Sequence, residues 1–378
     1  MVTRVLVLGA GCGGLELATV LSAQLGADAR VTLLDDSEAF VFGYSKLDLM
    51  FGRRTGAAVR LPYAGFAKPG VEVRRERIVA IDPAGRTVTT DAGTHEAEAL
   101  VVALGADYDF GATPGLLEGG DEFYSVAGAE RAAAKIPAFS SGRAVIGVCG
   151  HPFKCPPAPS EAALLLDENL RRRGVRDACE IVLVMPVAVP VPPSPEASEA
   201  LLAVFAERDV RFVPSRQPDS IDPQRRVVVL NDGQEVGFDL FLGVPRHKAP
   251  DVVVASGLTD DDGYVPVDPA TLRTRHEGVY AIGDVAKVGV PKAGIFAEGQ
   301  GRVLGELLAA EALGEGAPAG YDGLGSCFIE FGAGQVGRVD VDFFSGPVPT
   351  GAFQDPSAAL VAEKDEFGAH RSSRWFGA

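Results

Sequence analysis

Short apolar runs alternate along most of the chain with segments whose apolar positions follow a helical period. The run at 4–8 ends in a glycine-rich turn, and residues 15–25 then have the spacing of a helix. A further apolar run occupies 29–34, and two more, at 144–148 and 180–185, flank another helical segment. Strands that alternate with helices in this way are typical of an α/β fold with parallel sheets.

The pattern divides the chain into three parts. Residues 1–110 and 240–320 are predicted to form one discontinuous domain, because the strand and turn patterns of the two segments complement each other. Residues 111–239 form a second α/β unit of similar layout, and residues 321–378 form a small C-terminal element. The predicted fold class is therefore α/β, with two Rossmann-like domains and a C-terminal addition.

The C-terminal element has a different pattern. Residues 325–332 and 337–344 alternate in polarity, which predicts a hairpin. The last stretch, 363–377, carries aromatic side chains beside basic ones, and we expect it to pack on its own domain. The alternative for this stretch is contact with a membrane interface or a partner.

The first strand and turn predict a dinucleotide site. Gly9, Gly11 and Gly14 lie between the first strand and the first helix, where glycines allow a phosphate to approach the helix N-terminus. Asp35 follows the next strand, about twenty residues further on, where an acid binds the adenosine ribose. The flanking strands and helix make this a specific signal.

Two later segments indicate that the dinucleotide is FAD. Residues 274–284 form a strand that ends in Gly283 and Asp284, and they resemble the second FAD motif of glutathione-reductase-like flavoproteins. In that motif the acid holds the ribityl or pyrophosphate region of FAD. The stretch 100–106, with Gly105, resembles the strand and turn that return to the FAD domain, although Leu104 replaces the usual threonine.

The segment 151–161 replaces the glycine turn that would bind NAD in the second unit. Its Cys155 is followed by prolines and then by a helical segment, so the cysteine lies near a helix N-terminus. The helix macrodipole, Lys154 and His151 would favour a thiolate there, and Glu161 would accept a proton. The alternative is that Cys155 is an inert buried residue.

The strand at 180–185 also lacks a following acid for an NAD ribose, which argues against NADH as the redox partner. Nicotinamide binding through other contacts remains the alternative. Beyond Asp284, a helix is predicted to begin just after Lys292 and to point its N-terminus at the flavin. There Lys292 would stabilise negative charge on the reduced isoalloxazine, unless it is simply a surface lysine.

Composition narrows the choice of partners. With 378 residues and 47% hydrophobic content the chain can bury two or three cores, and its net charge of −16 disfavours nucleic acid and anionic membranes. The five cysteines, with no leader sequence, suggest a reducing, cytoplasmic setting. No metal site is expected, since the cysteines lack paired spacing. No apolar stretch is long enough to cross a bilayer, so we expect at most peripheral contact with the cytoplasmic face of the membrane.

Together these motifs resemble the sulfide:quinone oxidoreductase and flavocytochrome c sulfide dehydrogenase family. The specific part of the resemblance is the run 154–161, the cysteine at 327 and the run 291–294. The resemblance implies that Cys155 first receives the sulfur of sulfide and that Cys327 lies nearest flavin C4a. It also implies that Glu161 is an active-site acid, and that electrons leave FAD for a quinone or an electron-carrier protein.

Two departures from the family pattern change these expectations. Many members have a third essential cysteine just after the returning strand, whereas residues 118–130 contain none, so growth of a polysulfide chain is not expected. The longer C-terminal amphipathic helices of the family are also missing, so strong membrane attachment is not expected.

Three functions are therefore compared. The first is an FAD-dependent oxidoreductase that oxidises sulfide, or a related small sulfur compound, through Cys155 and Cys327. The second is an NAD(P)H-dependent flavoprotein reductase of a disulfide, persulfide or quinone. The third is a flavin redox sensor without turnover. All three are compatible with a homodimer.

Overall fold

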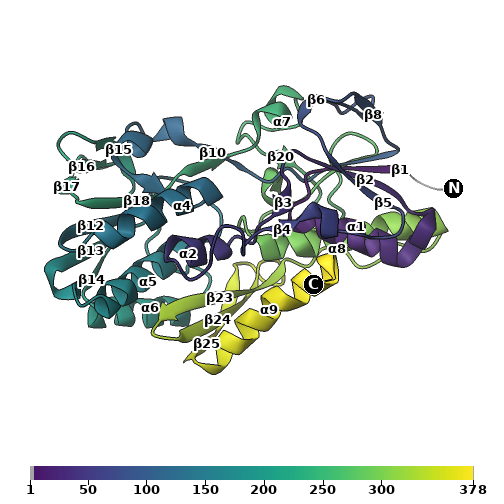
Figure 1. Ribbon diagram of the computed structural model, residues 1–378. Helices are drawn as coiled ribbons and strands as arrows, with labels where there is room; N and C mark the ends of the chain where they lie inside the picture. The colour runs from purple at the N-terminus through teal and green to yellow at the C-terminus, as the bar shows by residue number, and fades with distance from the viewer. Residues whose placement is uncertain (1–3, 378) are drawn as a thin grey trace.

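The computed structural model describes residues 4–377 and contains two five-stranded parallel sheets (Figure 1). The first sheet has the order β21 (Val279–Ala281), β9 (Ala99–Val102), β1 (Arg4–Leu8), β2 (Arg30–Asp35) and β5 (Val71–Arg75). Its strands come from both sequence segments of the predicted discontinuous domain, 1–110 and 240–320. The predicted α/β class with Rossmann-like sheets is confirmed, because consecutive parallel strands require helical crossovers that bury both faces.

The first sheet is covered by two helices that lie side by side (Figure 1). They are α1 (Cys12–Leu25) and α8 (Gly294–Leu313). Their close approach depends on Gly301, where an added Cβ would lie 2.3 Å from the carbonyl oxygen of Gly13. This contact fixes the N-terminal ends of both helices beside the carboxyl edge of the sheet.

The second sheet has the order β11 (Asp121–Glu122), β18 (Leu240–Val244), β12 (Gly142–Val148), β13 (Cys179–Val184) and β14 (Val210–Val213). Strand β18 pairs with β12 in parallel, with Ala144 opposite Leu240. The predicted boundary at 239/240 is therefore misplaced, since β18 belongs to the second sheet. Its apolar run is compatible with either sheet, and only strand pairing decides its place.

Shorter elements surround the two sheets. The other helices before residue 320 are α2 (Ser45–Met50), α3 (Leu116–Gly119), α4 (Val126–Lys135), α5 (Ala158–Arg172), α6 (Pro195–Glu207) and α7 (Asp251–Ala255). Small sheets are formed by β3 (Ala39–Phe40) with β4 (Leu61–Pro62), by β6 (Ile78–Asp82), β7 (Thr87–Thr90) and β8 (Thr94–Glu96), by β10 (Asp107–Asp109) with β19 (Arg246–Lys248), by β15 (Pro218–Asp222), β16 (Val227–Leu230) and β17 (Glu235–Gly237), and by β20 (Val265–Pro266) with β22 (Ala286–Lys287).

The C-terminal element is larger than the predicted hairpin. It is a three-stranded antiparallel sheet of β23 (Leu324–Gly332), β24 (Gln335–Asp342) and β25 (Thr350–Ser357), followed by α9 (Ala359–Phe376). Figure 1 shows this sheet and α9 lying beneath the other two units. The sheet packs on α5 and α8, one from each parallel-sheet unit. It therefore closes the space between them.

The last segment packs on its own chain, as the sequence predicts. Trp375 is fully buried, and its Nε1 donates to Glu16 Oε2 at 2.8 Å, while Arg374 pairs with the same carboxylate. Among residues 4–377, none of the helices has both the length and the apolar character needed to span a bilayer.

The Trp375→Ala variant should lose at least about 3 kcal/mol of unfolding free energy, because it empties a large buried site and leaves Glu16 with fewer donors. Chemical denaturation followed by circular dichroism measures this loss. Val79→Ala is the control, since Val79 is 57% exposed and its truncation should change stability by about 0.5 kcal/mol or less. Equal stability of the two variants would contradict the docking of α9.

Candidate active site

The turn between β1 and α1 has the shape of a phosphate site. Gly14 must be glycine, because an added Cβ would lie 2.1 Å from the carbonyl oxygen of Gly9. Gly11 is the N-cap of α1, and no side chain caps this helix end. No protein atom lies within 4 Å of the position of a Cβ at Gly11. The open space before an uncapped helix N-terminus fits the pyrophosphate of a dinucleotide.

The other predicted cofactor residues gather at the same edge of the first sheet. Asp35 ends β2, and its Oδ2 accepts from Ala10 N at 2.8 Å. Gly105 follows β9 and has a φ of +68°, while Gly283 and Asp284 follow β21. Since carboxyl ends of neighbouring parallel strands meet at one edge, sequence motifs far apart converge there. Desolvation raises the pKa of Asp284, and Lys154, Lys292 and Lys46 oppose that shift.

Cys155 lies on the loop between β12 and α5, at the place where an NAD domain would have its glycine turn. Its φ is +53°, and its main-chain N–H donates to Lys292 O at 2.8 Å. Helix α5 begins three residues later, at Ala158, whose N–H donates to Cys155 O at 2.9 Å. The loop is thereby tied to the segment before α8, which belongs to the first unit.

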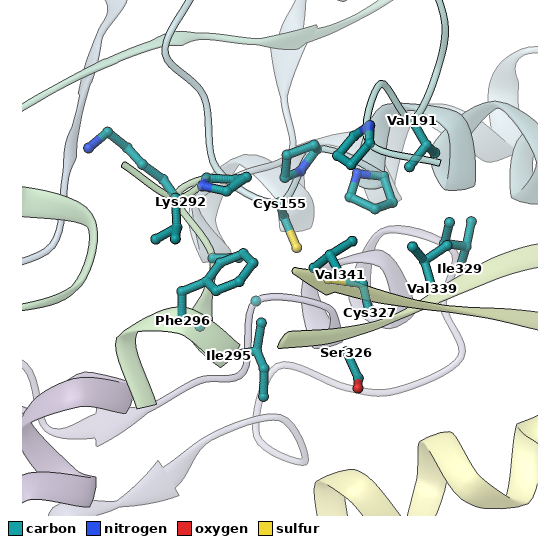
Figure 2. Close-up of a pocket in the computed structure, with 18 of the residues that line it drawn as sticks. Cys155, Val191, Lys292, Ile295, Phe296, Ser326, Cys327, Ile329, Val339 and Val341 are labelled. Atoms are coloured by element: carbon teal, nitrogen blue, oxygen red, sulfur yellow. The ribbon is translucent and has the colours of Figure 1, made fainter. Parts of the chain in front are cut away.

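A cavity of about 760 Å³ lies in front of this loop. Cys155, Glu161, Lys292 and Cys327 all line it, so the structure brings the four predicted reactive residues to one space. Figure 2 shows the Cys155 thiol pointing into the cavity toward the strands that carry Cys327, with Phe296 and Ile295 on another side. Most of the wall is apolar, formed by Met185, Val187, Pro190, Val191, Pro192, Pro193, Ile329, Val339, Val341, Val348 and Pro349.

Both thiols are half-buried in the wall of the cavity. Burial raises the pKa of Cys155 far above its usual range, and the charges of Glu161 and Cys327 act in the same direction. Burial also raises the pKa of Cys327 to about 12, again with Glu161 as the next cause. All five cysteines, which fall within the described residues, are free thiols.

The expected stabilisation of a Cys155 thiolate by its neighbours is therefore wrong. The Lys154 ammonium is directed elsewhere: it donates to Ala106 O at 3.0 Å and lies 4.7 Å from the centre of the Tyr108 ring. Burial lowers the pKa of His151, which favours its neutral form. A lysine next to the cysteine in sequence predicted proximity of charge, but the loop turns the two side chains in different directions.

Glu161 is placed to exchange a proton near neutral pH. It lies in the first turn of α5 and is 4% exposed. Burial raises its pKa to about 7, and Lys364, Glu330 and Arg53 modify that shift. Its Oε1 accepts from the main-chain N–H of Glu330 at 3.0 Å. A carboxyl group with this pKa can both accept and return a proton at physiological pH.

Lys292 is not a surface lysine. Its ammonium donates to Asp284 O and lies 3.4 Å from the centre of the Tyr264 ring. Burial lowers its pKa to about 8, with Lys154 adding to the effect and Asp284 opposing it. Helix α8 begins two residues later with no side-chain cap, so a cation and a helix N-terminus face the same region.

Four residues of this region were missed by the sequence analysis. Arg53, Glu330 and Lys364 form ion pairs behind Glu161, and Tyr124 Oη donates to Cys155 O at 3.5 Å. The sequence did offer a signal for Glu330, which is the one acid inside the apolar stretch 328–331. A lone carboxylate in a buried strand needs charged or polar partners. Tyr124 lies in the segment that lacks the family's third cysteine, and nothing in its sequence context marks it.

Comparison with known proteins places this geometry in a family. The family model described as pyridine nucleotide-disulphide oxidoreductase matches residues 3–301, which include both parallel sheets. The chain belongs to the pyridine nucleotide-disulphide oxidoreductase family.

Among residues 4–377, no group of three or more His, Cys, Asp or Glu side chains is arranged to hold a metal ion.

Within the family, the flavoprotein is similar to sulfide:quinone oxidoreductases. It is 25% identical over 379 residues to the mitochondrial enzyme of Mus musculus, an alignment that covers 95% of this chain and 82% of the mouse protein. The solved structure of the sulfide:quinone oxidoreductase of Aquifex aeolicus has the same fold, with a TM-score of 0.87, 22% identity, and coverage of 98% of this chain and 91% of that chain. A NAD-dependent persulfide reductase from A. fulgidus is also similar in fold, with a TM-score of 0.67, 20% identity, and coverage of 90% of this chain and 64% of that chain.

The predicted family, fold class and cofactor are confirmed by these findings. The chain is an FAD-dependent oxidoreductase that is similar to sulfide:quinone oxidoreductases. The residues present fit FAD, since the open helix N-terminus at Gly11 and the edge formed by Asp35, Gly105 and Asp284 lie on one sheet.

Proposed function

We propose that this flavoprotein oxidises sulfide, or a closely related small sulfur compound, with Cys155 and Cys327 as a redox pair. One observation carries the proposal: two cysteines from different units of the chain line one largely apolar cavity beside the proposed flavin edge. Similarity to sulfide:quinone oxidoreductases over most of the chain supports the same substrate. Gly9, Gly11, Gly14, Asp35, Gly105, Gly283, Asp284 and Lys292 are the residues proposed to hold FAD.

The sulfur chemistry begins from a disulfide between Cys155 and Cys327. Hydrosulfide attacks the Cys155 sulfur; a new sulfur–sulfur bond forms, the disulfide breaks, and Cys327 leaves as a thiolate. An external nucleophile then takes the outer sulfur of the Cys155 persulfide and leaves a second thiolate. When bound, FAD would supply the two-electron acceptor for the oxidation that rejoins the two thiolates as a disulfide, and would pass the electrons to the final acceptor.

Neighbouring residues support this cycle. Glu161 takes the proton of the incoming sulfide, because its pKa of about 7 keeps part of the population deprotonated at neutral pH. Lys292, with the uncapped N-terminus of α8, offers positive charge where the reduced flavin would carry a negative one. Tyr124 occupies the space beside the Cys155 carbonyl, which supports a cycle with two cysteines and an external sulfur acceptor.

We propose a quinone as the electron acceptor. The long apolar wall of the cavity, built by the proline-rich loop 186–195 and the C-terminal strands, is suited to a ring with an aliphatic chain. A quinone acceptor would bring the protein to a membrane by peripheral contact, in a reducing compartment that keeps its other cysteines as thiols.

Anaerobic titration tests the proposed function. Sulfide should bleach the visible flavin band of the purified holoenzyme within seconds, and NADH should not, because Cys155 and prolines replace the phosphate turn of the second unit. Dithionite defines the fully reduced end point in the same cuvette. Bleaching by NADH alone would assign the protein to the NAD(P)H-dependent reductases. A NAD-dependent persulfide reductase has a similar fold. Bleaching by neither would favour a redox sensor.

A further inference from the structure

A second cavity adjoins the one that the two thiols line. Its volume is about 540 Å³, and it is lined by a mixture of apolar and charged groups, among them Asp48, Arg53 and Glu330. Phe42, Tyr44 and Lys364 line both cavities, and therefore form a wall between them. Glu161 lines the apolar cavity, and its charged neighbours line the second one.

Lys364 in this wall belongs to a cluster of ion pairs with Arg53 and Glu330, which line the second cavity. Arg53 Nη1 and Nη2 donate to the two carboxylate oxygens of Glu330 at 2.6 and 2.9 Å. Lys364, from α9, pairs with the same carboxylate, and Asp48 pairs with Arg53 at 2.8 Å. The Glu330 carboxylate therefore holds two cations from elements that are distant in sequence.

The same Glu330 holds Glu161 through its main chain. Its N–H is the donor to Glu161 Oε1, at 3.0 Å, and its residue is 8% exposed. The side chain of Glu330 fixes the position of this donor, because two cations anchor it to α9 and to the segment after α2. The ionisable groups that act on Glu161 or respond to its charge come from all the surrounding elements: Arg53, Tyr124, Cys155, Cys327, Glu330 and Lys364.

We propose that the cluster of Arg53, Glu330 and Lys364 positions Glu161 and decides whether it is charged during turnover, which makes helix α9 part of the active-site machinery. The inference rests on the proposed function, in which Glu161 handles the proton of sulfide. The three residues act through Glu161, and we assign them no contact with the sulfur substrate.

The electrostatics give the two ends of the ion pair opposite effects. Burial is the main cause that raises the pKa of Glu161; the negative charge of Glu330 raises it further, and the positive charges of Lys364 and Arg53 lower it. A base must be deprotonated to act, so the rate falls as the pH falls through this pKa. Removing the charge of Glu330 should move the acidic limb of the pH profile to lower pH, and removing the charge of Lys364 should move it to higher pH.

The test measures flavin reduction by sulfide in anaerobic stopped flow, as a function of pH and without any acceptor. Glu330→Gln, which keeps the main-chain N–H, should shift the acidic limb by about one pH unit to lower pH, and Lys364→Met by about one unit to higher pH. All variants meet the same ionisation of sulfide itself. A difference between variants therefore reports on the protein.

A second readout does not depend on turnover. The infrared band of the protonated Glu161 carboxyl group is identified by its absence in Glu161→Gln, and its titration in the oxidised holoenzyme should follow the same two shifts. The double variant Glu330→Gln/Lys364→Met removes one charge of each sign, and both its limb and its band should return close to the wild-type pH. This variant keeps the test open if a single variant does not fold.

Arg374→Met is the matched control. It removes a cation from the same helix α9, paired with the buried carboxylate of Glu16, but this pair is not among the groups that act on Glu161. Its thermal stability should fall while its limb stays at the wild-type pH.

Two failures are distinguishable. If the acidic limb of Glu161→Gln coincides with the wild-type limb, Glu161 is not the base, and that part of the proposed function is overturned. If Glu161→Gln displaces the limb from its wild-type pH, but the Glu330 and Lys364 variants shift it in the same direction or not at all, the proposed role of the cluster is overturned.

Discussion

Flavin reduction by sulfide should slow by at least about 10³-fold in the Cys155→Ser variant, while its FAD content stays at the wild-type level. A serine oxygen cannot form the disulfide that hydrosulfide attacks or carry the persulfide sulfur. The cysteine sits on a loop at the cavity, and the residues proposed to hold FAD lie at the edge of the first sheet, so loss of the thiol should spare cofactor binding. Stopped-flow absorbance of the flavin band, with FAD released by heat as the measure of content, checks both statements.

Cys179→Ser is the matched control for this experiment. Cys179 is 6% exposed at the start of β13, and it lines a surface hollow at the opposite end of that strand from the Cys155 loop. The control should reduce at close to the wild-type rate. Retention of a fast sulfide reaction in Cys155→Ser would show that another residue receives the sulfur, and would remove Cys155 from the cycle.

FAD affinity should fall by at least about 10³-fold in the Gly11→Asp variant, or about 4 kcal/mol, while the apoprotein keeps its stability. Gly11 is the N-cap of α1 with an extended backbone, a position at which aspartate caps a helix well. Its Cβ would meet no protein atom within 4 Å, so the apoprotein has room for the side chain. The carboxylate would then occupy the space proposed for the FAD pyrophosphate and repel the negative charge of that group. Fluorescence titration with FAD and thermal melting of the apoprotein measure the two effects.

Gly11→Asn separates charge from size in this test. Asparagine has nearly the same volume and also caps helices, but it carries no charge. Its loss of FAD affinity should be smaller than that of Gly11→Asp by at least about tenfold, because only the aspartate opposes the negative pyrophosphate. Equal FAD affinity in the wild type and Gly11→Asp would contradict the position of the pyrophosphate at this turn.

Much of the fold follows from local patterns. The run 4–8 and the glycines after it predict a strand, a turn and a helix, because glycine spacing and apolar periodicity act over neighbouring residues. The same reasoning recovered the acid at the end of β2, whereas the Gly283 and Asp284 turn was found by its resemblance to a motif of known flavoproteins. The parallel arrangement then brings these segments to one edge of the first sheet.

Local patterns were less informative where strands could pair in more than one way. Strand β18 was assigned to the first unit, yet it pairs with β12 in the second. The C-terminal hairpin proved to have a third strand, β25, whose sequence 350–357 contains a proline and a glycine that weaken a strand signal. Pairing partners are chosen by packing over the whole chain, and the apolar pattern of one strand does not name them.

By itself the sequence determined that the chain has an FAD-type glycine turn, a Cys155 loop in place of an NAD turn, and a second cysteine at 327. Only the tertiary structure decided that Cys155 and Cys327 share a cavity, that Lys154 points away from it, and that Glu161 has ion pairs behind it. The physical reason is range. Turn geometry and helix capping act within a few residues, whereas burial and charge pairing depend on side chains that meet only after folding.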